Sequence, residues 1–148
     1  MKRLNLAIIG QGRSGRDIHG VYCRSERNAY YNVKYIVDFD ERRRNQAKDL
    51  YPGCETFSDY KELFNKDDID LVVNASFSHM HFEITKELLE HRKNVLVEKP
   101  FARNMYECET LINTKEKRRC TRSISEYTAC AVLFARFKTC VRRNARRG

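Results

Sequence analysis

The sequence lacks several features that would place it in other protein classes. No apolar stretch among its 148 residues is long enough to cross a membrane, so a membrane-spanning helix is excluded. Its six cysteines include no Cys-x-x-Cys pair, and the spacing of a metal site is therefore missing. The first apolar run is short and contains Asn5, which indicates a strand rather than a signal peptide. We expect a cytoplasmic domain with reduced thiols and one hydrophobic core.

The first 114 residues also have no formal net charge. Residues 1–114 contain 18 Lys and Arg against 18 Asp and Glu, whereas residues 115–148 contain 11 against 2. The formal net charge of +9 therefore belongs to the last 34 residues. It says nothing about partners of the preceding domain. Because no motif of a nucleic-acid-binding fold is recognisable, we do not expect nucleic acid as a partner.

A glycine-rich turn is the most informative feature that is present. Gly10-Gln11-Gly12-Arg13-Ser14-Gly15 has the form Gly-x-Gly-x-x-Gly and directly follows the apolar run Leu4 to Ile9. A second apolar run, Val33 to Val37, ends at Asp38, 23 residues after Gly15. A glycine turn between a strand and a helix, with an acidic residue at this distance, predicts a dinucleotide-binding unit. The predicted cofactor contacts are the six residues of the turn and Asp38.

Each residue of this pattern has a physical task. Gly10 would allow the tight turn, Gly12 would let the backbone approach a pyrophosphate, and Gly15 would let the helix pack closely on the sheet. The helix N-terminus offers N–H groups and partial positive charge to the phosphates. Asp38 would accept hydrogen bonds from the hydroxyls of the adenosine ribose. The alternative is a glycine-rich loop that binds no ligand.

Strand and helix patterns alternate along the chain. We expect strands at 4–9, 33–37, 55–57, 71–73 and 94–97, and helices at about 14–23, 41–50, 58–64 and 79–91. Ser58 is expected to cap the short third helix, and Asn104 to cap a last helix with Glu107 in a capping-box-like pair. Such alternation implies parallel strands joined by right-handed crossovers. The predicted fold class is α/β, a doubly wound, Rossmann-like parallel sheet over residues 1–118, followed by a basic tail over residues 119–148.

Further motifs identify a family. Asn94-Val95-Leu96-Val97-Glu98-Lys99-Pro100 is a strand that ends in Glu-Lys-Pro, and Asp70-Leu71-Val72-Val73-Asn74-Ala75-Ser76 is a strand with its loop. His81 follows where the next helix opens. Together with the glycine turn and Asp38, this order resembles the N-terminal half of the glucose–fructose oxidoreductase/inositol dehydrogenase (Gfo/Idh/MocA) family, over residues 4 to about 114.

The resemblance implies an NAD(P)-dependent oxidoreductase that transfers a hydride to or from a sugar, cyclitol or related polyol. Lys99, the implied catalytic residue, would lie beside the nicotinamide and the reacting hydroxyl, where a cation can stabilise a developing alkoxide. Glu98 would position the nicotinamide side, and Pro100 biases Lys99 toward an extended backbone. The implied cofactor contacts beyond the turn and Asp38 are Ala75, Ser76, Phe77, His81, Glu98, Lys99 and Pro100.

Other roles remain open for some of these side chains. Lys99 has the alternative of a solvated lysine at a strand end. His79 and His81 lack a third ligand, so we expect helix capping or cofactor contacts and no metal. His19 is expected to pack in the first helix.

The choice of dinucleotide is less sharply determined. Asp38 would repel a 2′-phosphate, which favours NAD. Arg42 and Arg43 lie close in sequence and would bind that phosphate if they turned inward, or would form the solvated face of a helix. We predict NAD, with NADP as the alternative.

The chain departs from the family after Thr114. The family's C-terminal α+β domain carries substrate contacts and usually a catalytic histidine or aspartate, and 34 residues are too few to form it. Two hypotheses follow: the cofactor half of an oxidoreductase, and a truncated, non-catalytic dinucleotide-binding module with a basic interaction tail. The tail is interpreted as a disordered extension, an amphipathic helix or the product of a changed reading frame. Oligomerisation is left open.

Overall fold

The computed structural model of the protein describes residues 3–118. The predictions for the basic tail, residues 119–148, lie outside the described residues. Within residues 3–118, no helix combines the length and the apolar character that a bilayer crossing requires.

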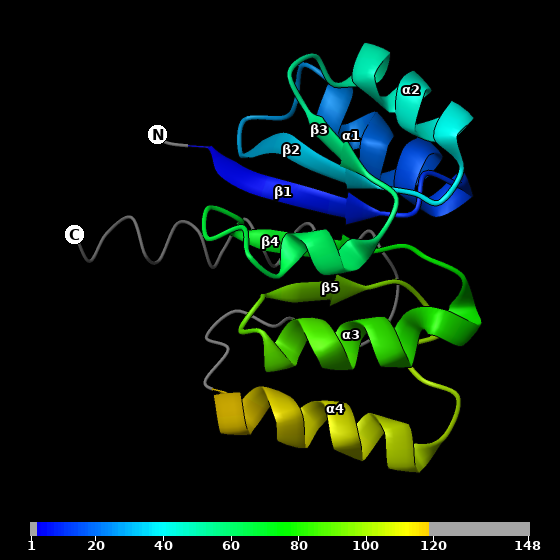
Figure 1. Ribbon diagram of the computed structural model, residues 1–148, viewed down its shortest axis with the longest axis vertical. Coiled ribbons are helices and arrows are strands. Elements are labelled where there is room, and N and C mark those ends of the chain that lie inside the picture. The colour runs from blue at the N-terminus through cyan, green and yellow to red at the C-terminus, as the bar shows by residue number, and fades with distance from the viewer. Residues whose placement is uncertain (1–2, 119–148) are drawn as a thin grey trace, which may run out of the picture.

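Five strands form one parallel sheet at the centre of the fold (Figure 1). Its spatial order is β3-β2-β1-β4-β5, so the chain builds outward from β1 first on one side and then on the other. This reversal of strand order is the doubly wound arrangement that the sequence predicts, and it is confirmed. The strands are β1 (Leu4–Ile9), β2 (Tyr31–Val37), β3 (Glu55–Phe57), β4 (Leu71–Asn74) and β5 (Val95–Val97).

Helical segments connect successive strands. A wide, π-type segment η1 (Arg13–His19) continues into α1 (Gly20–Arg24), and η3 (Ser78–Met80) leads into α3 (His81–Glu90). The others are α2 (Glu41–Leu50), η2 (Tyr60–Leu63) and α4 (Met105–Arg118).

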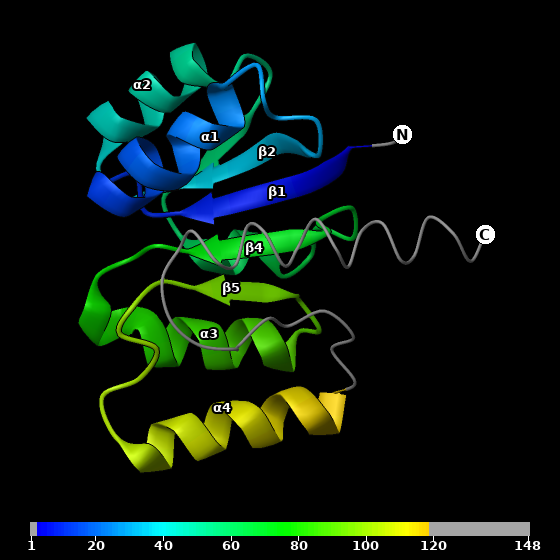
Figure 2. The same cartoon turned by 180° about the vertical axis from the view of Figure 1, so that it is seen from behind.

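Hydrophobic side chains project from both faces of the sheet, as expected for a buried parallel sheet. Along β1, Ala7 and Ile9 belong to one core cluster and Leu6 and Ile8 to the other. The first cluster includes side chains of η2, α3 and α4, and the second includes side chains of α1 and α2. Figures 1 and 2 show the two sides of this arrangement. The result is a three-layer fold with helical segments packed on both faces of the sheet.

The first helix differs from the predicted plain helix over about 14–23. The N–H of Gly20 donates to the carbonyl of Gly15, five residues earlier, which widens the first turns. The widened segment packs closely against Tyr51: a Cβ added at Gly20 would lie only 2.3 Å from the Tyr51 hydroxyl. The second strand begins at Tyr31, two residues before its predicted start.

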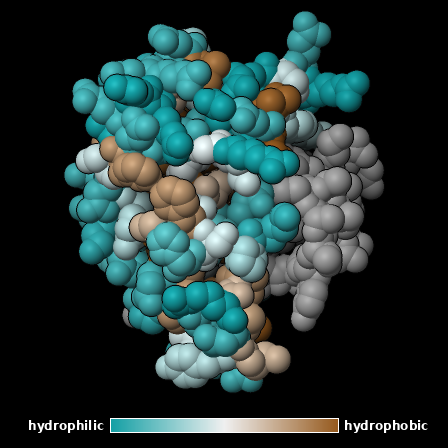
Figure 3. Space-filling view, turned by 90° about the vertical axis from the view of Figure 1, so that its right-hand side faces the viewer, coloured by the Kyte–Doolittle hydropathy of each residue, from teal (hydrophilic) through white to brown (hydrophobic). Residues whose placement is uncertain are grey.

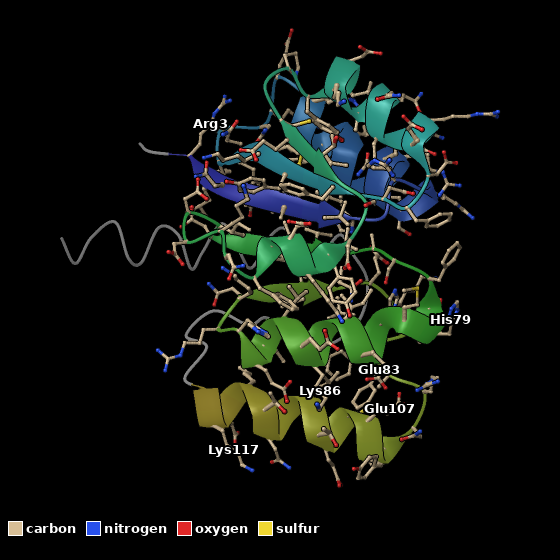
Figure 4. All side chains as sticks on the ribbon, in the orientation of Figure 1. Arg3, His79, Glu83, Lys86, Glu107 and Lys117 are labelled. Atoms are coloured by element: carbon tan, nitrogen blue, oxygen red, sulfur yellow. The ribbon has the colours of Figure 1, made fainter. Side chains whose placement is uncertain are left out.

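One predicted helix cap is wrong and the other is confirmed. Ser58 is wrong as the cap of the short third helix, because Asp59 precedes η2 and its Oδ1 accepts the N–H of Lys61 at 2.9 Å. Asn104 caps α4 as predicted, since its Oδ1 accepts the N–H of Glu107 at 3.0 Å. The carboxylate of Glu107, labelled in Figure 4, accepts instead the N–H of Arg103 at 2.9 Å. The guanidinium of Arg103 also binds this carboxylate, because Nε of Arg103 donates to it at 2.8 Å.

Candidate cofactor-binding site

The predicted site residues follow the carboxyl ends of four parallel strands. The glycine turn follows β1, Asp38 follows β2, Ala75 to Phe77 follow β4, and Glu98 to Pro100 follow β5. Parallel strands end at the same edge of a sheet, so the fold brings these segments to one side of the molecule. Figure 3 faces this side and shows a hydrophobic patch surrounded by hydrophilic side chains.

The three glycines of the turn have different surroundings. Gly10 has a φ of +89°, and a Cβ there would lie 2.3 Å from the carbonyl oxygen of Ala75. A Cβ on Gly15 would lie 1.8 Å from the carbonyl oxygen of Gly10. On Gly12, by contrast, the nearest atom would be Nη1 of Arg43, at 3.8 Å. Packing therefore requires Gly10 and Gly15, whereas the space over Gly12 is open to a ligand.

Asp38 is bonded to the glycine turn. Its Oδ2 accepts the main-chain N–H of Gln11 at 2.7 Å, and its Oδ1 accepts the N–H of Asp40 at 2.9 Å. The residue is only 5% exposed. Nη1 of Arg43 lies 3.6 Å from Oδ2 of Asp38. The carboxylate that sequence reasoning assigned to the ribose thus also fixes the end of β2 against the turn.

A buried asparagine organises the loop after β4. The Nδ2 of Asn74 donates to the carbonyl of His81 at 3.2 Å and to Oγ1 of Thr85 at 3.0 Å. Its Oδ1 accepts the hydroxyl of Ser76 at 2.7 Å. These bonds orient the segment that contains Ala75 and Ser76.

His81 joins the loops that follow β4 and β5. Its Nδ1 lies 2.8 Å from the carbonyl oxygen of Pro100, and its Nε2 lies 3.1 Å from that of Ser76. The side chain is buried. The structure therefore places His81 beneath the site, where it holds two predicted cofactor-lining segments together.

Glu98 and Lys99 lie in different surroundings although they are adjacent. The carboxylate of Glu98 is buried, with Oε1 2.6 Å from Nε2 of His19 and Oε2 accepting the N–H of Lys99 at 3.3 Å. Lys99 itself is exposed. Glu98 therefore anchors the strand end to the first helical segment, and Lys99 remains accessible at the edge.

Exposed aromatic rings lie beside these loops. Phe77 is 52% exposed and Phe39 is 67% exposed, and their ring centroids are 5.9 Å apart. His79 stacks on Phe77 at 5.8 Å; Figure 4 labels it at the right-hand end of the molecule, where the strands end. Across residues 3–118, no three His, Cys, Asp or Glu side chains lie together in a group that could hold a metal ion.

Sequence reasoning missed three features of this site. Asn74 could have been noticed, because it is an amide at the end of an otherwise apolar strand. Phe39 could also have been noticed, because it directly follows Asp38. Its aromatic ring lies beside that of Phe77 at the same edge of the sheet. The contact between His19 and Glu98 joins residues 79 positions apart, and no local pattern indicates it.

A glycine turn after the first strand of a doubly wound parallel sheet, joined to an acidic residue after the second, defines a dinucleotide-binding domain of the Rossmann type. The chain belongs to the GFO_IDH_MocA family, whose model, described as "Oxidoreductase family, NAD-binding Rossmann fold", matches residues 4–126. The predicted family and NAD as the cofactor of its domain are thereby confirmed. The match extends past the predicted limit of about residue 114.

Several known proteins are similar to the chain. The "uncharacterized oxidoreductase YhhX" of Escherichia coli (strain K12) is 34% identical over 108 residues, which cover 73% of this chain and 31% of that protein. An inositol 2-dehydrogenase of Mycolicibacterium smegmatis is 37% identical over 100 residues, which cover 68% and 28%. The crystal structure of GenD2 from gentamicin A biosynthesis in complex with NAD superimposes with a TM-score of 0.73 at 24% identity, over 80% of this chain and 33% of that one. The chain thus spans about a third of these relatives.

Proposed function

We propose that this chain is the nucleotide-binding half of an NAD-dependent oxidoreductase that transfers a hydride to or from a sugar, cyclitol or related polyol. The observation that carries the proposal is the 2.7 Å bond between Asp38 and the N–H of Gln11, because it joins the ribose-binding carboxylate to the phosphate-binding turn. The similarity to inositol 2-dehydrogenases supports the polyol class. We also propose that the nucleotide-binding domain covers residues 1–118.

The residues of the turn fit a dinucleotide. The open space over Gly12 lets the main chain approach a pyrophosphate, and the first turn of η1 offers N–H groups to its oxygens. Asp38 would accept the ribose hydroxyls through the lone pairs that its two main-chain bonds leave. Ala75, Ser76 and Phe77 would line the nicotinamide half, supported from below by Asn74 and His81.

Lys99 is the proposed catalytic residue. When bound, the nicotinamide supplies or accepts the hydride. Lys99 would stabilise the charge that develops on the substrate oxygen, because its ammonium group attracts a developing alkoxide. Glu98 would hold the backbone of Lys99 in place through its bond to the Lys99 N–H.

Two measurements on the full chain test the proposal. Calorimetric titration with NAD should show binding, and a panel of polyols should then be screened for reduction of NAD at the absorbance band of the reduced nicotinamide. Lys99→Ala should lose reduction of NAD, whereas Lys61→Ala, which removes another exposed lysine outside the predicted site, should keep both binding and reduction. Failure of NAD to bind would refute the function.

A second candidate is a module that binds the dinucleotide without turnover and uses its basic segment for an interaction. It is favoured by the chain's coverage of only 31% and 28% of two relatives, because turnover also requires a positioned acid or base for proton transfer. Binding of NAD without reduction across the whole polyol panel would favour this module over the oxidoreductase.

A further inference from the structure

Lys99 stands in the chain between two residues that buried histidines hold. On one side, Oε1 of Glu98 lies 2.6 Å from Nε2 of His19. On the other side, the carbonyl oxygen of Pro100 lies 2.8 Å from Nδ1 of His81. Both histidines are only 1% exposed, whereas Lys99 is exposed. The backbone on each side of Lys99 is therefore fixed from within the domain, while the residue itself stays accessible.

His19 belongs to the helical segment that begins directly after the glycine turn. Within η1, the N–H of Arg16 donates to the carbonyl of Gly12 at 3.0 Å. The bond from the N–H of Gly20 to the carbonyl of Gly15 then widens the segment, and both His19 and Gly20 are buried. Widened helical turns of this kind occur frequently at functional sites. The ring of His19 thus extends from the same segment whose first N–H groups are the predicted phosphate donors.

The carboxylate of Glu98 joins this segment to Lys99. An ionised carboxylate only accepts hydrogen bonds, so Nε2 of His19 donates to Oε1 of Glu98. The second oxygen, Oε2, accepts the main-chain N–H of Lys99 at 3.3 Å. A continuous set of contacts therefore runs from the phosphate-binding turn through η1, His19 and Glu98 to the main chain of Lys99.

We propose that His19 is a positioning residue, which acts through Glu98 to hold Lys99 beside the nicotinamide of a dinucleotide bound at the turn. The inference rests on the proposed function and deepens it by naming the residue that sets Lys99 relative to the cofactor. Misplacement of a reacting group by about 1 Å costs about a hundredfold in rate. Loss of the His19 bond should therefore displace Lys99 and slow the reaction, while the main-chain N–H groups of the turn still bind NAD.

Protection of Lys99 by NAD tests the inference without requiring turnover. The full chain is treated with acetic anhydride, with and without saturating NAD, and the acetylation rates of Lys99 and Lys61 are measured by peptide mass spectrometry. In the unmodified protein, NAD should slow the acetylation of Lys99 and leave that of Lys61, an exposed lysine of η2, unchanged. His19→Leu should lose this protection, although its calorimetric affinity for NAD should change by less than about threefold.

Three further variants separate positioning from a loss of stability. His19→Gln keeps a side-chain N–H that can donate to Glu98, and it should restore the protection. Glu98→Gln has nearly the same shape but one acceptor oxygen in place of two, so it should break one side of the bridge and lose the protection. Leu63→Val is the matched control, because it trims a fully buried side chain of η2, and it should keep NAD binding and the protection of Lys99.

Kinetics supply a second measurement with any polyol that the unmodified protein oxidises. His19→Leu should lower kcat by about ten- to hundredfold and leave KM for NAD within about threefold. His19→Gln should recover kcat. An equal change of kcat in Leu63→Val would assign the effect to lost stability and overturn the inference.

The labelling results separate the inference from the proposed function. Loss of protection in His19→Leu and Glu98→Gln, with NAD bound and with recovery in His19→Gln, supports the inference. Protection retained in either of the first two variants overturns it and leaves the function standing, since Lys99 then still lies beside NAD. If His19→Leu does not fold, Glu98→Gln decides by the same criterion.

Two results would reach further than the role of His19. If NAD bound to the unmodified protein without protecting Lys99, the catalytic assignment of Lys99 and the inference would both be overturned, while the binding of NAD would stand. Failure of NAD to bind would overturn the proposed function and the inference together.

Discussion

Replacement of Asp38 by alanine should change both the stability of the domain and its affinity for NAD. The carboxylate is buried and accepts the N–H groups of Gln11 and Asp40 at 2.7 and 2.9 Å. A hydrogen bond to a charged group contributes about 1.5–3 kcal/mol to stability. At the lower end of that range, loss of two such bonds lowers the free energy of unfolding by about 3 kcal/mol.

The loss of affinity for NAD has a separate origin. A ribose hydroxyl would donate to the remaining lone pairs of the Asp38 carboxylate, and the variant has no acceptor there. We expect NAD binding to weaken by about ten- to hundredfold. The preference against NADP should also relax, because the negative charge nearest to the 2′-phosphate is removed while Arg43 remains.

Two assays separate these effects. Urea unfolding followed by circular dichroism gives the free energy of unfolding, and calorimetry under conditions where the variant is folded gives the affinities. Asp40→Ala is the matched control: it removes a carboxylate two residues away that caps α2, so it should cost about 1 kcal/mol and leave NAD binding intact. If the folded Asp38→Ala variant bound NAD as tightly as the unmodified protein, the ribose assignment would be refuted and only the structural role would remain.

Three further predictions concern other parts of the chain. Gly12→Ala should change the free energy of unfolding by less than about 0.5 kcal/mol and abolish NAD binding, whereas Gly15→Ala, whose Cβ would lie 1.8 Å from the oxygen of Gly10, should cost at least about 1–3 kcal/mol in urea unfolding. Burial raises the pKa of the Cys23 thiol to about 11, so the thiolate is scarce at pH 8 and alkylation measured by peptide mass spectrometry should accelerate steadily up to that pKa. Deletion of residues 119–148 should keep the calorimetric affinity for NAD within about twofold, and a large loss would show that the deleted segment completes the domain.

The sequence by itself determined the order of the elements and the edge at which the site lies. Apolar runs separated by helical patterns indicate parallel strands, and the glycine turn, Asp38 and Glu-Lys-Pro each follow such a run. Because parallel strands all end on one side, these motifs had to meet at one edge of the sheet. Local pattern was sufficient here, since each signal lies within a few residues of the strand that positions it.

The tertiary structure alone decided what the side chains of the site contact. It joined His19 to Glu98, turned Arg43 and not Arg42 toward the glycine turn, and placed His81 beneath two loops. These contacts depend on how helices from distant parts of the chain pack on the sheet. Hydrophobic periodicity specifies which face of a helix is buried. The hydrogen-bond partner of a buried polar group depends instead on how segments that are distant in the sequence lie relative to one another in the folded chain.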